Sequence, residues 1–157
     1  MIEEPKLLRP VAEIRVPGAK RFVASEHLKA ANVGFVRGEF GRLLSNKEER
    51  NVPDITVVVH QLENHSNDAW IRGCLGDHTE IQLAHFFGLL EKQSQGGEGL
   101  LLTDGLKWNM AYVLGLGGDP AVMDSIWDGG NDSWILSACS VGYLRHLAGD
   151  QIFSREA

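Results

Sequence analysis

Four apolar runs lie between Gly99 and Ser140, and short polar segments separate them. These segments read Asp-Gly, Gly-Gly-Asp-Pro and Gly-Gly-Asn-Asp. Strand-length apolar runs joined by turns of this composition are typical of antiparallel hairpins. The pattern therefore predicts a four-stranded antiparallel β-meander over about residues 99–140.

The segment before the meander has the period of a helix. Its start, Asp77-His78-Thr79-Glu80, matches a capping box, in which the first side chain caps backbone amides and the fourth reaches back. The apolar stripe behind it consists of Leu83, Phe86, Phe87 and Leu90. Because such a stripe needs an apolar partner, we expect one main amphipathic helix over about residues 78–93, packed against the meander in an α+β fold.

Shorter patterns fill the first half of the chain. Alternation and β-branched composition predict short strands at 11–16, 21–24, 33–36 and 55–62. A short amphipathic helix is expected over residues 38–46. Residues 1–10 contain two prolines and are predicted to form a loose N-terminal tail, so that residues 11–157 make a single domain.

The meander aligns three of its tryptophans if its turns are tight. A turn at Gly130-Asn131 places Trp127 opposite Trp134, and a turn at Gly117-Gly118 places Trp108 opposite Trp127. The favoured interpretation is that this row is the core face under the helix. The functional alternative is an exposed aromatic platform, with Trp134 the most accessible member because it lies at the loop end of its strand.

Charge is distributed unevenly along the chain. Residues 1–50 contain ten Lys and Arg against seven Asp and Glu, whereas residues 51–157 contain five against fourteen, and the net charge is −6. The larger part of the chain would repel phosphates, which argues against a nucleic-acid partner and favours a partner with a basic surface. No apolar run approaches the roughly 20 residues that span a bilayer, and the start MIEEPKLLRP lacks the features of a signal peptide.

The two cysteines, Cys74 and Cys139, are far apart and lack metal-type spacing. We expect both to be reduced in a cytoplasmic protein. A pair formed by a cysteine and a histidine that the fold brings together remains open. Ser137 and Ser140 lack the G-x-S-x-G elbow of a nucleophilic serine.

The spacing of the candidate ligands and of the glycines argues against a metal site and against a cofactor site. On one helix, Glu80 would point about 160° away from His78, and His85 would lie roughly 10 Å along the axis from His78, too far for one ion. The cluster Gly115–Gly118 precedes another strand, whereas a phosphate cradle needs a helix N-terminus. The spacing of Asp128, Asn131 and Asp132 misses a calcium loop. We therefore predict no metal and no cofactor.

From about residue 68 to residue 155 the chain resembles small uncharacterised bacterial proteins. The resemblance is carried by LGDHTEIQLAHFFGLLEKQ, GEGLLLTDG, the W-D-G…W pair and the closing QIFSR. It implies that helix and meander form one unit, and it implies no activity, ligand or site residue.

These patterns favour a non-enzymatic binding or protein-interaction module that uses the loop end of the meander. The residues expected to bind are Trp127, Asp128, Asn131, Asp132 and Trp134. One alternative is a small hydrolase-type enzyme with a histidine plus a cysteine or aspartate. The other is carbohydrate binding on the tryptophan row. An enzyme predicts a concave pocket that holds at least two convergent titratable groups.

Overall fold

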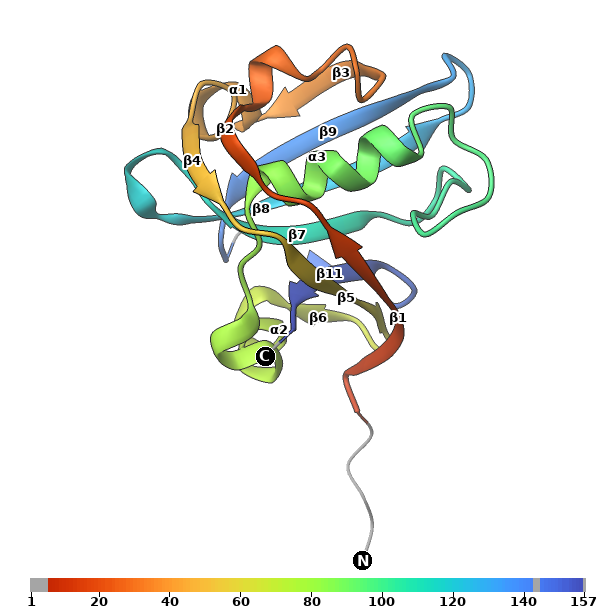
Figure 1. Cartoon of the computed structure of the whole chain (residues 1–157). Coiled ribbons are helices and arrows are strands. Elements are labelled where there is room, and N and C mark those ends of the chain that lie inside the picture. Colours follow the sequence, from red (N-terminus) through yellow and green to blue (C-terminus); the bar gives the residue numbers. More distant parts are fainter. Residues whose placement is uncertain (1–5, 143–144, 157) are drawn as a thin grey trace, which may run out of the picture.

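The computed structural model describes residues 6–142 and 145–156 and contains one large mixed β-sheet (Figure 1). Its seven strands lie in the order β1-β5-β11-β7-β8-β9-β3. Their bounds are β1 Leu8–Val16, β5 Ile55–Leu62, β11 Gln151–Arg155, β7 Asn109–Leu114, β8 Pro120–Asp128, β9 Ser133–Ser140 and β3 Val33–Gly38. Neighbouring strands are antiparallel except at β11–β7 and β3–β9, which are parallel.

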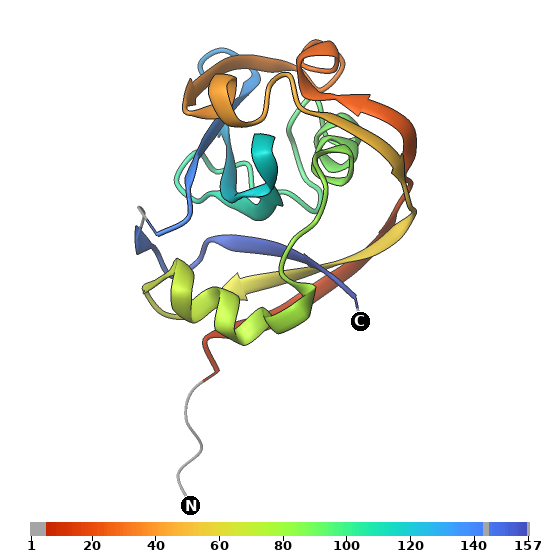
Figure 2. The same cartoon turned by 90° about the vertical axis from the view of Figure 1, so that its left-hand side faces the viewer.

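Two further pairs of strands form separate two-stranded sheets. β2 (Ala19–Val23) pairs with β4 (Glu48–Val52), and β6 (Ser66–Asn67) pairs with β10 (Arg145–His146). The β2–β4 pair continues the β1–β5 pair after a bend at Pro17-Gly18 and Pro53-Asp54, so the N-terminal ribbon curls upward from the sheet (Figure 2). The backbone N–H of Gly18 donates to Asp54 Oδ1 at 2.8 Å and fastens the two strands at the bend.

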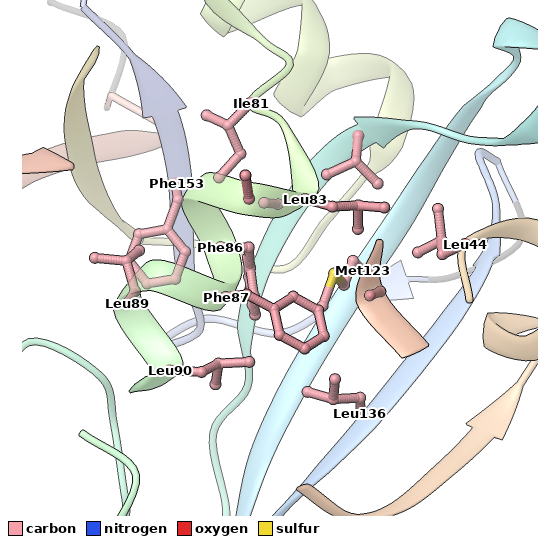
Figure 3. Packing of buried hydrophobic residues seen from close by; sticks show 14 of the residues in the cluster. Leu44, Ile81, Leu83, Phe86, Phe87, Leu89, Leu90, Met123, Leu136 and Phe153 are labelled. Carbon is pink, nitrogen blue, oxygen red and sulfur yellow. The ribbon is translucent and has the colours of Figure 1, made fainter. Parts of the chain in front are cut away.

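Helix α3 (Leu83–Lys92) lies inside the curve formed by the ribbon and by β7, β8 and β9 (Figure 2). Leu83, Phe86, Phe87 and Leu90 are fully buried, as the predicted stripe requires. Figure 3 shows these side chains in one cluster with Met123 and Leu136. The remaining helical segments are η1 Ala24–Glu26, α1 Phe40–Leu43, α2 Asp68–Leu75, η2 Gly76–His78 and η3 Leu116–Gly118. No described helix is long and apolar enough to cross a membrane.

The start of α3 differs from the prediction. The backbone N–H of Ile81 donates to Tyr112 O at 3.0 Å, so this residue extends along β7 and the helix cannot begin at residue 78. Gln82 is the N-cap and forms a capping box with His85. The buried Glu49 of β4 accepts hydrogen bonds from the N–H groups of Leu83 and Ala84 at 2.9 and 3.0 Å. A carboxylate at a helix N-terminus satisfies unpaired donors and complements the helix dipole.

The predicted fold, a four-stranded antiparallel meander over 99–140 on one main helix over 78–93, is wrong. Only β7, β8 and β9 form a meander, and they belong to a larger mixed sheet. Residues 99–108 form a loop in which side-chain amides replace a strand partner: Gln93 bonds the backbone N–H and C=O of Leu101, and Asn109 bonds those of Leu102. Because these backbone groups are satisfied locally, the apolar run needs no neighbouring strand.

Other predicted elements fare differently. The strand at 55–62 is confirmed as β5, and Trp127 does pair with Trp134. Trp108 precedes β7 and is not opposite Trp127. The predicted tail over 1–10 is too long, because residues 8–10 belong to β1; residues 1–5 lie outside the described part. The short helix expected at 38–46 covers only Phe40–Leu43.

A second layer covers part of the sheet face that points away from α3, which we call the outer face. Helix α2 lies below this face in Figure 2. Ile71 and Leu75 of α2 are buried against outer-face side chains in a separate apolar cluster. The strand residues of this cluster include Leu62, Met110, Tyr112, Val122 and Ile152. No buried member of this cluster comes from β9 or β3, although Cys139 of β9 packs against it, and the candidate site lies beside it.

The bend at Gly18 gives a direct test of the fold. A Cβ added at Gly18 would lie 1.7 Å from the carbonyl oxygen of Val52, which is backbone and cannot move alone. We expect Gly18→Ala to destabilise the protein by more than about 3 kcal/mol or to prevent folding. In the matched control Gly73→Ala, nothing lies within 4 Å of the added Cβ. Because Gly73 is in α2, this control should be neutral or stabilise by up to about 1 kcal/mol. Denaturant unfolding of both variants checks the prediction, and equal stability would contradict the described bend.

Candidate functional site

A row of polar side chains crosses the outer face where the second layer ends. Strand register pairs Arg37 of β3 with Ser137 of β9, and Ser137 with Asp124 of β8. The short β10 brings His146 to the same region. A cleft of about 290 Å³ opens between these elements. Its lining residues are Arg37, Trp108, Asp124, Ser137, Arg145, His146, Leu147 and Asp150. The cleft therefore gathers several titratable groups from strands that are distant in sequence.

Asp68, the first residue of α2, holds His146 in place. Asp68 Oδ1 accepts hydrogen bonds from His146 Nε2 at 2.6 Å and from the Tyr112 hydroxyl at 2.7 Å. Asp68 Oδ2 accepts from the backbone N–H of Gly142 at 2.6 Å. Burial alone would raise the pKa of Asp68, but the hydrogen bonds from His146, Gly142 and Tyr112 outweigh it and lower this pKa. Asp68 therefore remains a carboxylate and fixes His146 Nε2 as a donor.

The hydroxyl group of Tyr112 acts as a hydrogen-bond donor to Asp68. Burial and the neighbouring Asp68 carboxylate raise the pKa of Tyr112 far above its ordinary value. The phenol therefore stays protonated and connects β7 to α2.

Asp124 is the exception among the buried acids. Asp124 is only 6% exposed as a whole residue, yet no described residue donates a hydrogen bond to its carboxylate. Burial raises the pKa of Asp124 to about 7; the charges of His146 and Arg37 oppose this rise, whereas the Asp150 and Asp68 carboxylates add to it. A buried carboxylate without a donor is costly, and such groups concentrate at functional sites.

Asp150 and Trp108 also line the cleft. Asp150 accepts backbone hydrogen bonds from Trp108 at 3.0 Å and from Leu147 at 3.2 Å. Both of its carboxylate oxygens are thus occupied in holding the loop after β10. The Arg37 guanidinium lies 5.4 Å from the centre of the Trp108 ring, a cation–π distance. Trp108 therefore orients Arg37 at the mouth of the cleft.

Thiol chemistry is disfavoured here. Burial, together with the Asp124, Asp68 and Glu39 carboxylates, raises the pKa of Cys139 to about 11. A thiol that is protonated at neutral pH is a poor nucleophile. Cys74 is exposed and lines a different pocket. Within residues 6–142 and 145–156, no three His, Cys, Asp or Glu side chains are grouped as metal ligands would be.

The residues predicted to bind do not form one surface. Trp134 is fully buried, its Nε1 donates to Gln93 O at 3.1 Å, and its ring packs edge-to-face on Trp127 at 5.1 Å. Both tryptophans face α3, so Trp134 is not the accessible member and the row is not an exposed platform. Asp128 accepts from Gly130 N–H and from the Asn131 side chain within the turn. Asn131 and Asp132 are exposed at this turn.

The cleft residues were missed for a physical reason. Asp68 and His146 are 78 residues apart, and each lies in a segment that the sequence pattern leaves irregular. One usable signal was present: Asp124 is the only charged side chain inside the apolar run AVMDSIW. An isolated acid in a buried strand needs a partner or a function.

Comparisons of the chain with protein-family models, with curated proteins and with solved structures found no match. A function for this chain therefore has to be inferred from the geometry of the cleft.

The raised pKa of Asp124 predicts a specific dependence of stability on pH. Because its pKa is raised in the folded state, the unfolded state gives up this proton first, and folded stability falls as pH rises from about 4 to about 7. We expect Asp124→Asn, which removes the charge, to stabilise the protein by roughly 2–4 kcal/mol at about pH 8 and by little at about pH 4.

Denaturant unfolding at both pH values measures this difference. The control is Asp119→Asn, an exposed aspartate whose side chain makes no recorded hydrogen bond with a described residue. A destabilised Asp124→Asn protein at high pH would show that the carboxylate has a structural partner.

Proposed function

We propose that the protein is a small acid–base enzyme of the hydrolase type that acts on a polar substrate in the cleft. Asp124 is the proton donor and His146 is the proton acceptor. The observation that carries this proposal is the Asp124 carboxyl, which is buried at the cleft and has no donor among the described residues. A carboxyl with a pKa of about 7 is matched to proton transfer near neutral pH.

The surroundings of His146 support its role as a base. Since Nε2 donates to the Asp68 carboxylate, the lone pair of the neutral imidazole is on Nδ1. A carboxylate behind a histidine fixes its tautomer and stabilises the imidazolium that forms on proton uptake. Asp68 is thus a positioning residue. With Cys139 protonated, a water molecule is the more suitable nucleophile, activated by His146 while Asp124 protonates the leaving group.

Chromogenic substrates of three classes test the proposal: p-nitrophenyl esters, phosphates and glycosides. We expect turnover of one class, and a loss of about hundredfold in kcat/KM for Asp124→Asn and for His146→Gln. The controls Asp132→Asn and His78→Gln change residues that do not line the cleft and should keep full activity. Full activity in both cleft variants, or a wild-type protein inert toward all three classes, would contradict the proposal.

A second function, binding of a protein partner at the loop end of the meander, is favoured by one observation. Phe35 on the edge strand β3 is 61% exposed, and a hollow of about 570 Å³ separates it from Asp128 and Asn131. Edge strands offer unpaired backbone groups to an added strand. An extended segment with an apolar and a basic side chain would fit this surface, given the net charge of −6.

Capture from native lysate tests this second function. We expect Phe35→Ser to reduce the captured partner by at least about tenfold. The matched control is Leu106→Ser, which changes a side chain that is 77% exposed outside the hollow. Equal capture by both variants would remove Phe35 from any interface. A cytoplasmic location and the lack of a nucleic-acid partner remain predictions from the sequence.

A further inference from the structure

We infer that the substrate of the cleft is an anion, whose charged group is held at the mouth by the guanidinium groups of Arg37 and Arg145. This inference rests on the proposed function of the cleft, and it names the class of molecule that the cleft accepts. Both arginines line the cleft from different strands, Arg37 from β3 and Arg145 from β10.

The two arginines differ from most others in the chain. Six arginines have a recorded ion pair or hydrogen bond with a described residue: Arg9, Arg21, Arg42, Arg50, Arg72 and Arg155. Arg37 and Arg145 have no acidic partner among the described residues, although Asp124 and Asp150 line the same cleft. Neither guanidinium group forms an ion pair within residues 6–142 and 145–156, and guanidinium groups suit carboxylate, sulfate and phosphate geometry.

The ring of Trp108 orients the guanidinium group of Arg37 before a ligand binds. Its guanidinium lies 5.4 Å from the centre of the Trp108 ring, and the backbone of Trp108 is tied to Asp150 at 3.0 Å. An arginine oriented by an aromatic ring loses less side-chain freedom when an anion binds. Its mobility is thus reduced before the ligand arrives.

Asp124, which also lines the cleft, gives the anion site a second property. Five titratable or charged side chains interact electrostatically with Asp124: Arg37 of β3, His146 of β10, Asp150 just before β11, Asp68 of α2 and Cys139 of β9. When its carboxyl is protonated, Asp124 donates a hydrogen bond to an anion, and when it is ionised it repels the anion. Anion binding should therefore be accompanied by proton uptake at Asp124.

Inorganic sulfate is a suitable probe because it remains a dianion throughout the relevant pH range. We expect wild-type protein to bind sulfate saturably in the millimolar range, measured by shifts of the Trp108 indole N–H signal. Arg37→Gln and Arg145→Gln should each weaken this binding by about tenfold. The matched control is Arg15→Gln, which removes an exposed arginine from β1 at the opposite edge of the sheet. Arg15→Gln should bind sulfate as the wild type does.

The proton linkage is measured in the same titration. Wild-type affinity should fall by about tenfold between about pH 6 and about pH 8. Asp124→Asn should bind sulfate without this fall, whereas His146→Gln should retain it. Equal affinity in wild type and Arg37→Gln, the lack of saturable binding, or a full pH dependence in Asp124→Asn would each overturn the inference.

The outcome is separable from that of the proposed enzyme. Sulfate binding lost in the arginine variants, with no catalytic turnover in the wild type, supports the anion site and overturns proton transfer. Turnover of an uncharged ester that depends on Asp124 and His146, without sulfate binding, supports proton transfer and overturns the anion site.

Discussion

The cost of burying a carboxylate organises this molecule. Among the described residues four acids are buried, and three of them accept hydrogen bonds on both carboxylate oxygens. Glu49 holds the N-terminus of α3, Asp68 joins α2 to β7 and β10, and Asp150 fastens the loop after β10 to the segment before β7. Since an unpaired buried charge would cost several kcal/mol, each of these acids fixes elements that the apolar core alone would leave free to slide.

Asp124 departs from this rule, and the departure is what gives the fold a candidate function. The same fold that places donors on Asp68 and Asp150 leaves Asp124 at a cleft with His146 and with two arginines that form no ion pair in the described part of the chain. Three of the buried acids receive donors from the described residues and the fourth receives none from them, a difference that points to a constraint other than stability. A ligand that supplies the missing partner accounts for the arrangement.

Local patterns in the sequence predict local structure here. The stripe Leu83 to Leu90 and the run at 55–62 are a helix and a strand because their periodicity matches the faces that they bury. The loop at 99–108 depends on the side-chain amides of Gln93 and Asn109, which take the place of a strand partner and which no periodicity reveals. The parallel pairings of β3 with β9 and of β11 with β7 join segments that are far apart in the sequence. The site was missed for the same reason, since the dyad of Asp68 and His146 forms across 78 residues.

Asp124 is buried at the cleft, and no residue among 6–142 and 145–156 donates a hydrogen bond to its carboxylate. The most direct test follows the carboxyl carbon of Asp124 by NMR across a pH titration of the folded protein, with Asp124→Asn to assign the signal. Because burial raises the pKa of Asp124, we expect the chemical shift of this carbon to titrate with a midpoint near pH 7. A midpoint near the ordinary aspartate pKa of about 4 would show that the carboxylate is solvated or has a hydrogen-bond donor, and would contradict the burial of Asp124 without a donor.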